Sequence, residues 1–109
     1  MAERWKVEFS QEVKDWYDGL AVSDFALARR AFELLRDRGP MLRMPQSRNL
    51  GDGLFELRFT CEHVARRVTY TIDPTRNVIT LTTFRKQRDN ERREVKRARA
   101  VLKRVQGDK

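Results

Sequence analysis

The sequence has few of the residues that build metal, redox and disulfide sites. Among its 109 residues there is one cysteine, Cys61, and one histidine, His63. A single cysteine excludes an intramolecular disulfide and a paired-cysteine metal site, and a single histidine excludes a site with several histidines. We therefore expect no metal and no cofactor, and a reducing cytoplasm as the compartment.

Long apolar runs are also missing. No stretch approaches the roughly 20 consecutive apolar residues that a transmembrane helix needs. The first nine residues, MAERWKVEF, lack the basic-then-apolar order of a signal peptide. These two absences predict a chain that does not insert into a membrane.

Acidic residues are too few to balance the basic ones. The chain has 16 Asp and Glu against 24 Lys and Arg, which gives a formal net charge of +8 and a sequence pI near 10.4. This excess predicts attraction to polyanions, with nucleic acid first and an anionic membrane surface second, although a strongly acidic protein would also satisfy it. The length suffices for one domain, 1–109, and is too short for two.

The first forty residues predict a strand followed by a helical hairpin. Residues 5–9 alternate apolar and charged side chains, which is the period of a half-buried strand. Ser10 offers an N-cap for a short amphipathic helix over 11–20, and Ser23 offers one for a second helix. Gly39-Pro40 ends that helix in the expected order, with glycine just past the end and proline after it.

The rest of the chain predicts a meander and a last helix. Residues 40–53 carry two prolines and two glycines and are expected to form an ordered loop. Strands are expected at 54–60, 64–72 and 78–84, paired antiparallel because their connections are short. A basic helix over 90–105 completes the order βααβββα. We therefore predict an α+β fold, with an antiparallel-rich twisted sheet packed on the N-terminal helical hairpin.

Three arginines in the predicted strands, Arg58, Arg66 and Arg67, are unusual because strands favour β-branched and aromatic residues. Side chains alternate across a strand, so Arg66 shares the parity of the apolar residues and is expected at the sheet's rim. All the apolar faces are expected to meet the helical hairpin. The opposite, polar face then comprises Arg58, Thr60, Arg67, Thr69, Thr71, Thr80, Thr82 and Lys86.

Cations surrounded by hydroxyls suit phosphate binding, since arginine offers bidentate donors and threonine adds short hydrogen-bonding groups. Glu56 has the same parity and could pair with a neighbouring arginine and orient it. The alternative is an ordinary solvated face of an antiparallel sheet, where threonine and arginine are common. Parity alone leaves both interpretations open.

Four segments in order resemble the RelE/HigB superfamily of type II toxins, particularly its phage-derived Gp49-like branch. Residues 50–58, LGDGLFELR, are similar to the family's L-x-x-G-L-[WYF]-E-L-R segment, and residues 67–70, RVTY, to its R-[VI]-x-Y. Residues 79–86, ITLTTFRK, resemble its h-x-L-L-x-x-F-x-K run, and residues 94–98 resemble its terminal E-[IV]-x-x-A. The resemblance spans about residues 5–104, almost the whole chain.

The resemblance implies a toxin that cleaves mRNA on the translating ribosome, without a metal, with RNA lying on the concave face of the sheet. The substrate's 2′-hydroxyl would attack the scissile phosphate. The family's basic active-site positions carry over to Arg58, Arg67 and Lys86, which stabilise the charge that develops. The implied partner is a helix-turn-helix antitoxin, and operator DNA would be bound only through that antitoxin.

The proton-transfer residue is left open by the sequence. Several family members use a late tyrosine or histidine, and neither occurs here after Tyr70. Lys86 could donate or accept a proton if neighbouring cations lower its pKa. Asp89 could be a base, although an aspartate before a helix is more often an N-cap. His63 lies in a predicted turn, and Tyr70 has the parity of the core.

The last helix and the residues before it carry further cations that could contact RNA or the ribosome. A narrow apolar stripe, Val95, Ala98, Leu102 and Val105, is expected to dock on the sheet. The cations are Arg85, Arg88, Arg92, Lys96, Arg99 and Lys103, which bind phosphate backbone or form only a solvated face. The alternative function is a non-catalytic RNA-binding or regulatory relative of the toxins.

Overall fold

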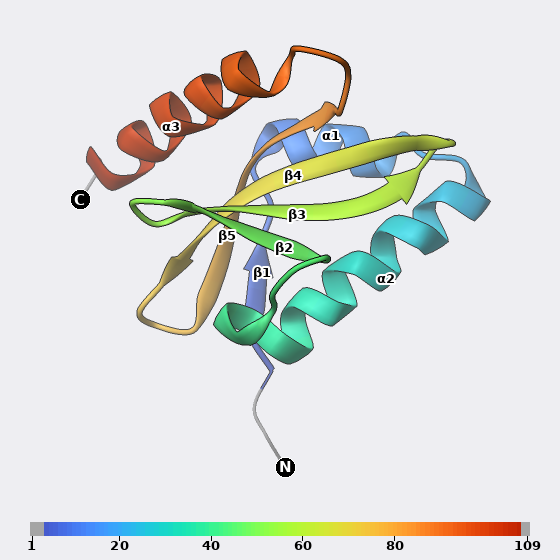
Figure 1. The fold of residues 1–109 in the computed structure, drawn as a ribbon. Helices are drawn as coiled ribbons and strands as arrows, with labels where there is room; N and C mark the ends of the chain where they lie inside the picture. The colour runs from blue at the N-terminus through green and yellow to red at the C-terminus, as the bar shows by residue number, and fades with distance from the viewer. Residues whose placement is uncertain (1–3, 108–109) are drawn as a thin grey trace.

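The computed structural model describes residues 4–107 and contains one five-stranded sheet with helices on both faces (Figure 1). The elements in chain order are β1 (Lys6–Glu8), α1 (Gln11–Asp18), α2 (Val22–Arg38), the 3-10 turn η1 (Gly39–Met41), β2 (Ser47–Gly51), β3 (Leu54–Cys61), β4 (Val64–Asp73), β5 (Asn77–Arg85) and α3 (Glu91–Gly107). The strand order is β1-β5-β4-β3-β2, in which β1 runs parallel to β5 and the other neighbours are antiparallel.

The helical hairpin forms, and the sequence predicted one boundary of each of its helices correctly. Ser10 caps α1, because its hydroxyl accepts a hydrogen bond from the Val13 N–H at 3.2 Å. The prediction that Ser23 caps α2 is wrong: Ala21 occupies the capping position, and Ser23 lies inside the first turn. Gly39 ends α2 as predicted, with its N–H donating to the Leu35 carbonyl.

A strand replaces part of the predicted loop over 40–53. β2 pairs with β3, placing Ser47 opposite Leu57 and Arg48 opposite Glu56. The sequence did not predict this strand because it is a polar edge strand without an apolar face. Arg48 and Asn49 are exposed, and only Ser47 is buried. The observed order is therefore βααββββα, one strand more than predicted.

The last strand has a β-bulge that simple alternation could not anticipate. Its pairing with β4 shifts between Val68 and Tyr70, so Thr80 lies opposite Tyr70 while Thr83 lies opposite Val68. Thr80 is therefore on the helical-hairpin side, where its hydroxyl bonds the Glu8 carbonyl, and its predicted place on the polar face is wrong. Beyond the bulge, Phe84 lies opposite Arg67, which returns the following Lys86 to the Arg67 side.

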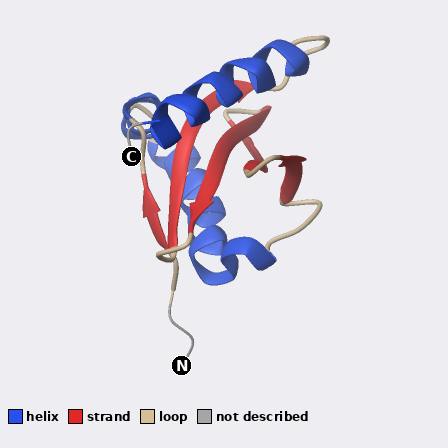
Figure 2. Cartoon of the chain, turned by 90° about the vertical axis from the view of Figure 1, so that its left-hand side faces the viewer, coloured by secondary structure: helices blue, strands red, loops and turns tan. Residues whose placement is uncertain are grey.

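Figures 1 and 2 show α3 on one side of the sheet and the helical hairpin on the other, and a separate core lies under each. The larger core packs α1 and α2 on one sheet face and includes Val13, Ala28, Phe32, Leu35, Leu57, Val68, Tyr70 and Val78. The smaller core packs α3 on the other face and consists of Leu54, Leu81, Ala98 and Leu102, with Ile79, Val95 and Val105 against it. The apolar stripe of α3 is confirmed. The expectation that every apolar strand face meets the helical hairpin is wrong for Ile79 and Leu81, which face α3.

Gly39 lies at the end of α2 against Trp5, the residue before β1, so its substitution tests this contact. Its φ is +51°, and a Cβ there would lie 2.5 Å from the Trp5 indole nitrogen. We expect Gly39→Ala to lower the free energy of unfolding by about 1–3 kcal/mol or more, because alanine is strained in that conformation and the indole must move. Chemical denaturation measures the change.

The matched control is Gly19→Ala. Gly19 ends α1 with φ −88°, and the nearest atom to an added Cβ is 3.4 Å away. This variant should unfold within about 0.5 kcal/mol of the wild type. Equal losses of stability in the two variants would contradict the role assigned to Gly39.

Candidate functional site

Two cross-strand rows place charged side chains together on the sheet face that α3 covers. In the first row Glu56 of β3 lies opposite Arg48 of β2 and Thr69 of β4. In the second row Arg58 of β3 lies opposite Arg67 of β4. Residues directly opposite in neighbouring strands share a face, so three strands contribute to one cluster of charges. The predicted pairing of Arg58 and Arg67 on one face is thus confirmed.

Glu56 is the centre of this cluster and has no exposed surface. Its Oε1 lies 3.6 Å from Arg67 Nε and 3.8 Å from Arg58 Nε. Both distances exceed those of an N–H···O hydrogen bond. In the described part of the chain neither Glu56 oxygen has a hydrogen-bond donor within reach, and the two arginine Nε atoms are likewise buried without an acceptor. The interaction is therefore an ion pair inside the protein without hydrogen bonds to complete it.

Burial shifts the ionisation of this cluster. It raises the pKa of Glu56 to about 7, and the negative charge of the Glu91 carboxyl adds to the rise. Arg67 and Arg58 oppose the rise without cancelling it. Burial, followed by the charge of Arg58, lowers the pKa of Arg67, yet a guanidinium starts so high that Arg67 stays charged at neutral pH.

Lys86 joins the cluster through Glu91, the first residue of α3. The Lys86 Nζ lies 3.9 Å from Glu91 Oε2 and donates a hydrogen bond to the Gln87 carbonyl at 3.1 Å. Glu91 Oε1 also lies 3.7 Å from Arg48 Nη1. The three predicted catalytic cations are therefore in one electrostatic unit, and they differ in access: the side chains of Arg67, Arg58 and Lys86 are 9%, 27% and 31% exposed.

Sequence reasoning missed two members of this unit, Arg48 and Glu91. Arg48 fell in the region predicted to be a loop, so no parity could be assigned to it. Glu91 stands at the start of a helix, where an acidic residue is expected simply because it suits the positive end of the helix dipole. Only the bend of the chain between β5 and α3 brings Glu91 back to the sheet.

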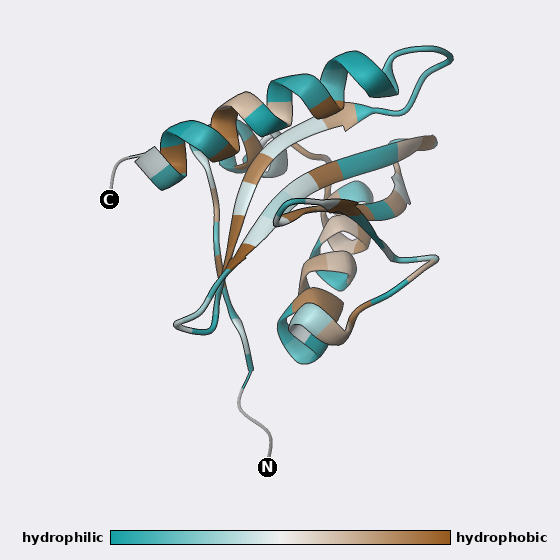
Figure 3. Ribbon diagram, turned by 60° about the vertical axis from the view of Figure 1, so that its left-hand side comes forward, coloured by the Kyte–Doolittle hydropathy of each residue, from teal (hydrophilic) through white to brown (hydrophobic). Residues whose placement is uncertain are grey.

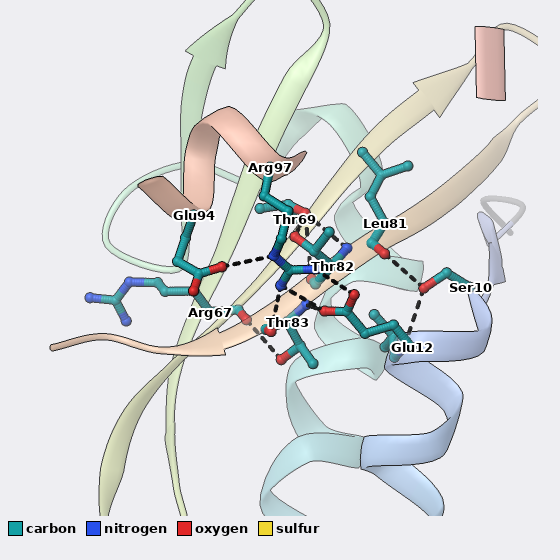
Figure 4. A network of polar contacts seen from close by, with 10 residues as sticks. Ser10, Glu12, Arg67, Thr69, Leu81, Thr82, Thr83, Glu94 and Arg97 are labelled. Carbon is teal, nitrogen blue, oxygen red and sulfur yellow. Dashed lines mark hydrogen bonds and ion pairs between the residues drawn. The ribbon is translucent and has the colours of Figure 1, made fainter. Parts of the chain in front are cut away.

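Arg97 fixes α3 over the sheet (Figure 4). Its Nη1 and Nη2 donate to the two carboxylate oxygens of Glu12 at 2.6 and 2.9 Å, and its Nε donates to Glu94 at 3.0 Å. Glu12 Oε2 also accepts the Thr83 N–H of β5 at 2.8 Å. This contact, the Arg97–Glu12 clamp, joins α1, β5 and α3. Arg97 is outside the cationic stripe that the sequence singled out.

The predicted cationic stripe of α3 is divided between structural and accessible positions. Arg99 donates to the carbonyls of Leu50 at 2.6 Å and Gly51 at 3.2 Å, which ties α3 to β2. Lys96 and Lys103 are exposed, in keeping with the mostly hydrophilic α3 of Figure 3. Arg92 and Arg99 line a groove of about 340 Å³ with Arg48, Leu50, Glu91 and Val95.

The remaining predicted cations lie apart from the cluster. Arg88 is exposed in the loop before α3. Arg85 lies opposite Arg66 and therefore on the helical-hairpin side of the sheet. Arg66 is correctly separated from Arg67 but is not a rim charge: it is buried, with its guanidinium 4.7 Å from the centre of the Trp16 ring and 3.2 Å from Glu62.

Two of the earlier proton-transfer candidates, His63 and Tyr70, lie apart from the cluster, whereas Lys86 belongs to it. His63 lies at the tip of the β3–β4 hairpin with φ +62°, four residues along the strand from Arg67, or roughly 13 Å. Asn90, not Asp89, immediately precedes α3, so Asp89 is not its N-cap. Tyr70 is in the core as predicted, stacked on Phe55 with ring centres 5.4 Å apart.

Within residues 4–107 no group of three or more His, Cys, Asp or Glu side chains is placed to hold a metal ion. Among the same residues no helix is long and apolar enough to cross a bilayer.

The raised pKa of Glu56 predicts a pH-dependent stability. Below about pH 4.5 the group is protonated in both the folded and the unfolded chain, so its contribution is complete. That contribution is lost as the pH rises through about 7, because only the unfolded chain ionises Glu56 freely. Relative to the wild type, Glu56→Gln should gain about 2–3 kcal/mol between pH 4.5 and pH 8 in urea unfolding.

Glu12→Gln provides the opposite control. Burial works against the ionisation of Glu12, but the hydrogen bonds from Arg97 and the Thr83 N–H outweigh it and lower its pKa. Its contribution is therefore present at neutral pH and lost as the pH falls into the acidic range. The variant should be less stable than the wild type at pH 7 and approach it in acid; the same pH trend in both glutamine variants would contradict this assignment.

Comparison with known proteins places this architecture. The chain is similar to a double arginine-to-alanine mutant of the E. coli toxin RelE in the free state, with a TM-score of 0.61 and 11% identity over 94% of this chain and 98% of that one. It is also similar to the toxin–antitoxin complex RelBE2 from Mycobacterium tuberculosis, with a TM-score of 0.55 and 22% identity over 76% of this chain and 99% of that one. No curated protein matches it.

These likenesses confirm the predicted α+β fold of RelE type, with the extra edge strand described above. Sequence comparison goes further than fold, because residues 15–103 match the family described as phage derived protein Gp49-like (DUF891). With the match covering most of its residues, the chain belongs to the phage-derived Gp49-like family.

Proposed function

We propose that this protein is the toxin of a type II toxin–antitoxin pair and inhibits translation in the cytoplasm by cutting mRNA on the ribosome. The observation that supports the proposal is the cluster of Arg58, Arg67 and Lys86, held together on one sheet face of a RelE-type fold. Two solved structures similar in fold are a RelE toxin and a toxin–antitoxin complex. The net charge of +8 suits an RNA substrate.

The chemistry follows from what the cluster offers to a phosphate. The 2′-hydroxyl of the nucleotide before the scissile bond attacks phosphorus, and the 5′-oxygen of the next nucleotide leaves. The charge that builds up on the phosphate oxygens is met by fixed cations, which stabilise it without reorganising. Arg58 and Lys86 have the exposure to touch the phosphate, and Arg67 adds its charge from below.

Partners follow from the same proposal. The complex RelBE2, similar in fold, contains an antitoxin with its toxin. We expect a helix-turn-helix antitoxin here, with operator DNA bound only through that protein. Ribosome contact is assigned to the exposed cations Arg88, Arg92, Lys96 and Lys103. Arg85 lies on the other sheet face, and Arg99 donates to the Leu50 carbonyl of β2, so we do not assign the main contact to either of them.

One observation favours the alternative of a non-catalytic RNA-binding relative. Arg67, the cation nearest the buried glutamate, has only 9% of its side chain exposed. A group so enclosed can act on a substrate through its charge but has little surface to contact one. The experiment below separates the two functions.

Induction in cells tests catalysis. We expect the wild type to arrest growth and to generate new mRNA ends, and Arg67→Ala or Lys86→Ala to lower the cleavage rate at least 100-fold, as loss of a group that stabilises developing charge does. Arg38→Ala, which removes an exposed arginine at the far end of α2, should retain the wild-type rate within about twofold. Growth of all strains with soluble wild-type protein and intact mRNA would favour the non-catalytic alternative.

Salt dependence tests the ribosome contact. Each phosphate contact contributes about 0.7–0.9 to the slope of log affinity against log salt concentration. The double variant Lys96→Ala/Lys103→Ala should therefore lower the slope for ribosome binding by about 1.5. The double variant Arg29→Ala/Arg38→Ala, with two exposed arginines of α2 replaced, serves as the charge-matched control. A slope that falls equally in both would show a general charge effect instead of a contact along α3.

A further inference from the structure

The groove between β2 and α3 lies beside the cationic cluster. Its volume is about 340 Å³, and its lining comes from two elements that are distant in the sequence. Arg48 and Leu50 belong to β2, whereas Arg92, Val95 and Arg99 belong to α3. The three α3 residues are spaced i, i+3 and i+7, so they share one face of the helix. The fold therefore brings three arginines to one hollow.

Two of these arginines have hydrogen-bond donors that the protein does not use. Arg48 has 51% of its side chain exposed, and its one interaction in the described part of the chain is the ion pair with Glu91. The N···O distance of that pair, 3.7 Å, is too long for a hydrogen bond. Arg92 is exposed and, among residues 4–107, has neither a hydrogen bond nor an ion pair. Their guanidinium groups are therefore free to donate to an anion, and a planar guanidinium matches a phosphate well.

The third arginine and the apolar lining offer a different kind of contact. Arg99 donates to the carbonyls of Leu50 at 2.6 Å and Gly51 at 3.2 Å, which fix its guanidinium in place. A guanidinium plane is a surface on which an RNA base can stack. Leu50 and Val95, both half-buried, add apolar contact area in the same groove. Cations for a phosphate and a flat, partly apolar surface for a base together suit one nucleotide.

Glu91 joins this groove to the cations proposed to hold the scissile phosphate. Its Oε1 lies 3.7 Å from Arg48 Nη1, and its Oε2 lies 3.9 Å from Lys86 Nζ. One carboxylate therefore spans the gap between the groove and the cluster. Glu91 is the one acidic residue of the groove lining in the described chain, and three arginines outnumber it. The groove thus keeps an excess of positive charge within one side chain's reach of Lys86.

We propose that this groove is a second nucleotide subsite, in which Arg48 and Arg92 bind the mRNA phosphate next to the scissile one and Arg99 receives the base of that nucleotide. The inference rests on the function proposed above. It also narrows the assignment made there: Arg92 contacts the mRNA, and the other exposed cations keep the ribosome contact. Contacts to the backbone and to a base face carry no sequence preference, because they leave the edges of the base unread.

The subsite has an expected kinetic signature. It binds the substrate away from the reacting atoms, so it contributes equally to the ground state and the transition state. Its loss should raise the half-saturating protein concentration and leave the plateau of the single-turnover rate unchanged. We expect Arg48→Ala and Arg92→Ala each to raise that concentration about tenfold, as loss of one hydrogen bond to a charged group does, with the plateau kept within about twofold.

Arg93→Ala is the matched control. Arg93 follows Arg92 in the same helix and is equally exposed, but it points from a different face and does not line the groove. The variant removes the same charge at the same end of α3. It should keep both the half-saturating concentration and the plateau within about twofold of the wild type.

A change in the substrate tests the same contact from the other side. The phosphates on either side of the scissile one are replaced in turn by a neutral 2′-O-methyl methylphosphonate linkage, with a 2′-O-methyl phosphodiester at the same place as the control. For the wild type, one of the two neutral linkages should raise the half-saturating concentration about tenfold. The same linkage should cost Arg48→Ala no more than about twofold, because the contact is already lost and the two changes are not additive.

The outcomes separate this inference from the proposed function. Normal cleavage by the wild type with fully additive losses, or with neutral linkages that have no effect, would overturn the subsite and leave the toxin function intact. Equal losses in Arg48→Ala, Arg92→Ala and Arg93→Ala would also overturn it, since they would show a general effect of charge. No cleavage by the wild type would overturn both proposals. Partial misfolding does not mimic the expected result, because it weakens the cleavage of both substrates alike.

Discussion

The arrangement of the site depends on one buried carboxyl, that of Glu56. Placing a charge in the interior without hydrogen bonds is costly, and two arginines at 3.6 and 3.8 Å compensate only part of that cost. The β3–β4 register places Arg58 opposite Arg67, and the negative charge of Glu56 offsets the repulsion between their like charges. The cations of the site are therefore held in place by a group that never meets the solvent. Such a cluster is costly to fold and well prepared to receive the negative charge of a phosphate.

The second requirement is the position of α3. The apolar seam of that helix is narrow, with Ala98 and Leu102 as its buried residues, so packing alone would fix it weakly. The Arg97–Glu12 clamp adds a bidentate contact to α1, and Arg99 adds two hydrogen bonds to β2. Together they hold the first turn of α3 near the sheet, where Glu91 pairs with Lys86 and Arg48.

Much of the fold follows from local patterns, and the exceptions have definite causes. Alternation predicted β1, β3, β4 and β5, and the helical stripes predicted both hairpin helices and α3. β2 was not predicted because an exposed polar edge strand shows no alternation of apolar and polar residues. The parity of Arg58 and Arg67 was correct because β3 and β4 pair without interruption. The sheet face predicted for Thr80 was wrong because the bulge in β5 reverses the faces. Beyond the bulge, Lys86 lies on the face predicted for it. Arg48 and Glu91 required the tertiary structure, since neither residue type nor spacing distinguishes them from ordinary surface charges.

The central claim is that this cationic face positions an RNA 2′-hydroxyl for attack on the adjacent phosphate. The most direct measurement replaces one nucleotide in a ribosome-bound mRNA, the one just before the cut, by its 2′-deoxy form. We predict that cleavage at that bond is lost while cleavage of the all-ribose mRNA leaves a 2′,3′-cyclic phosphate and a 5′-hydroxyl. Undiminished cleavage at the 2′-deoxy position would contradict the claim.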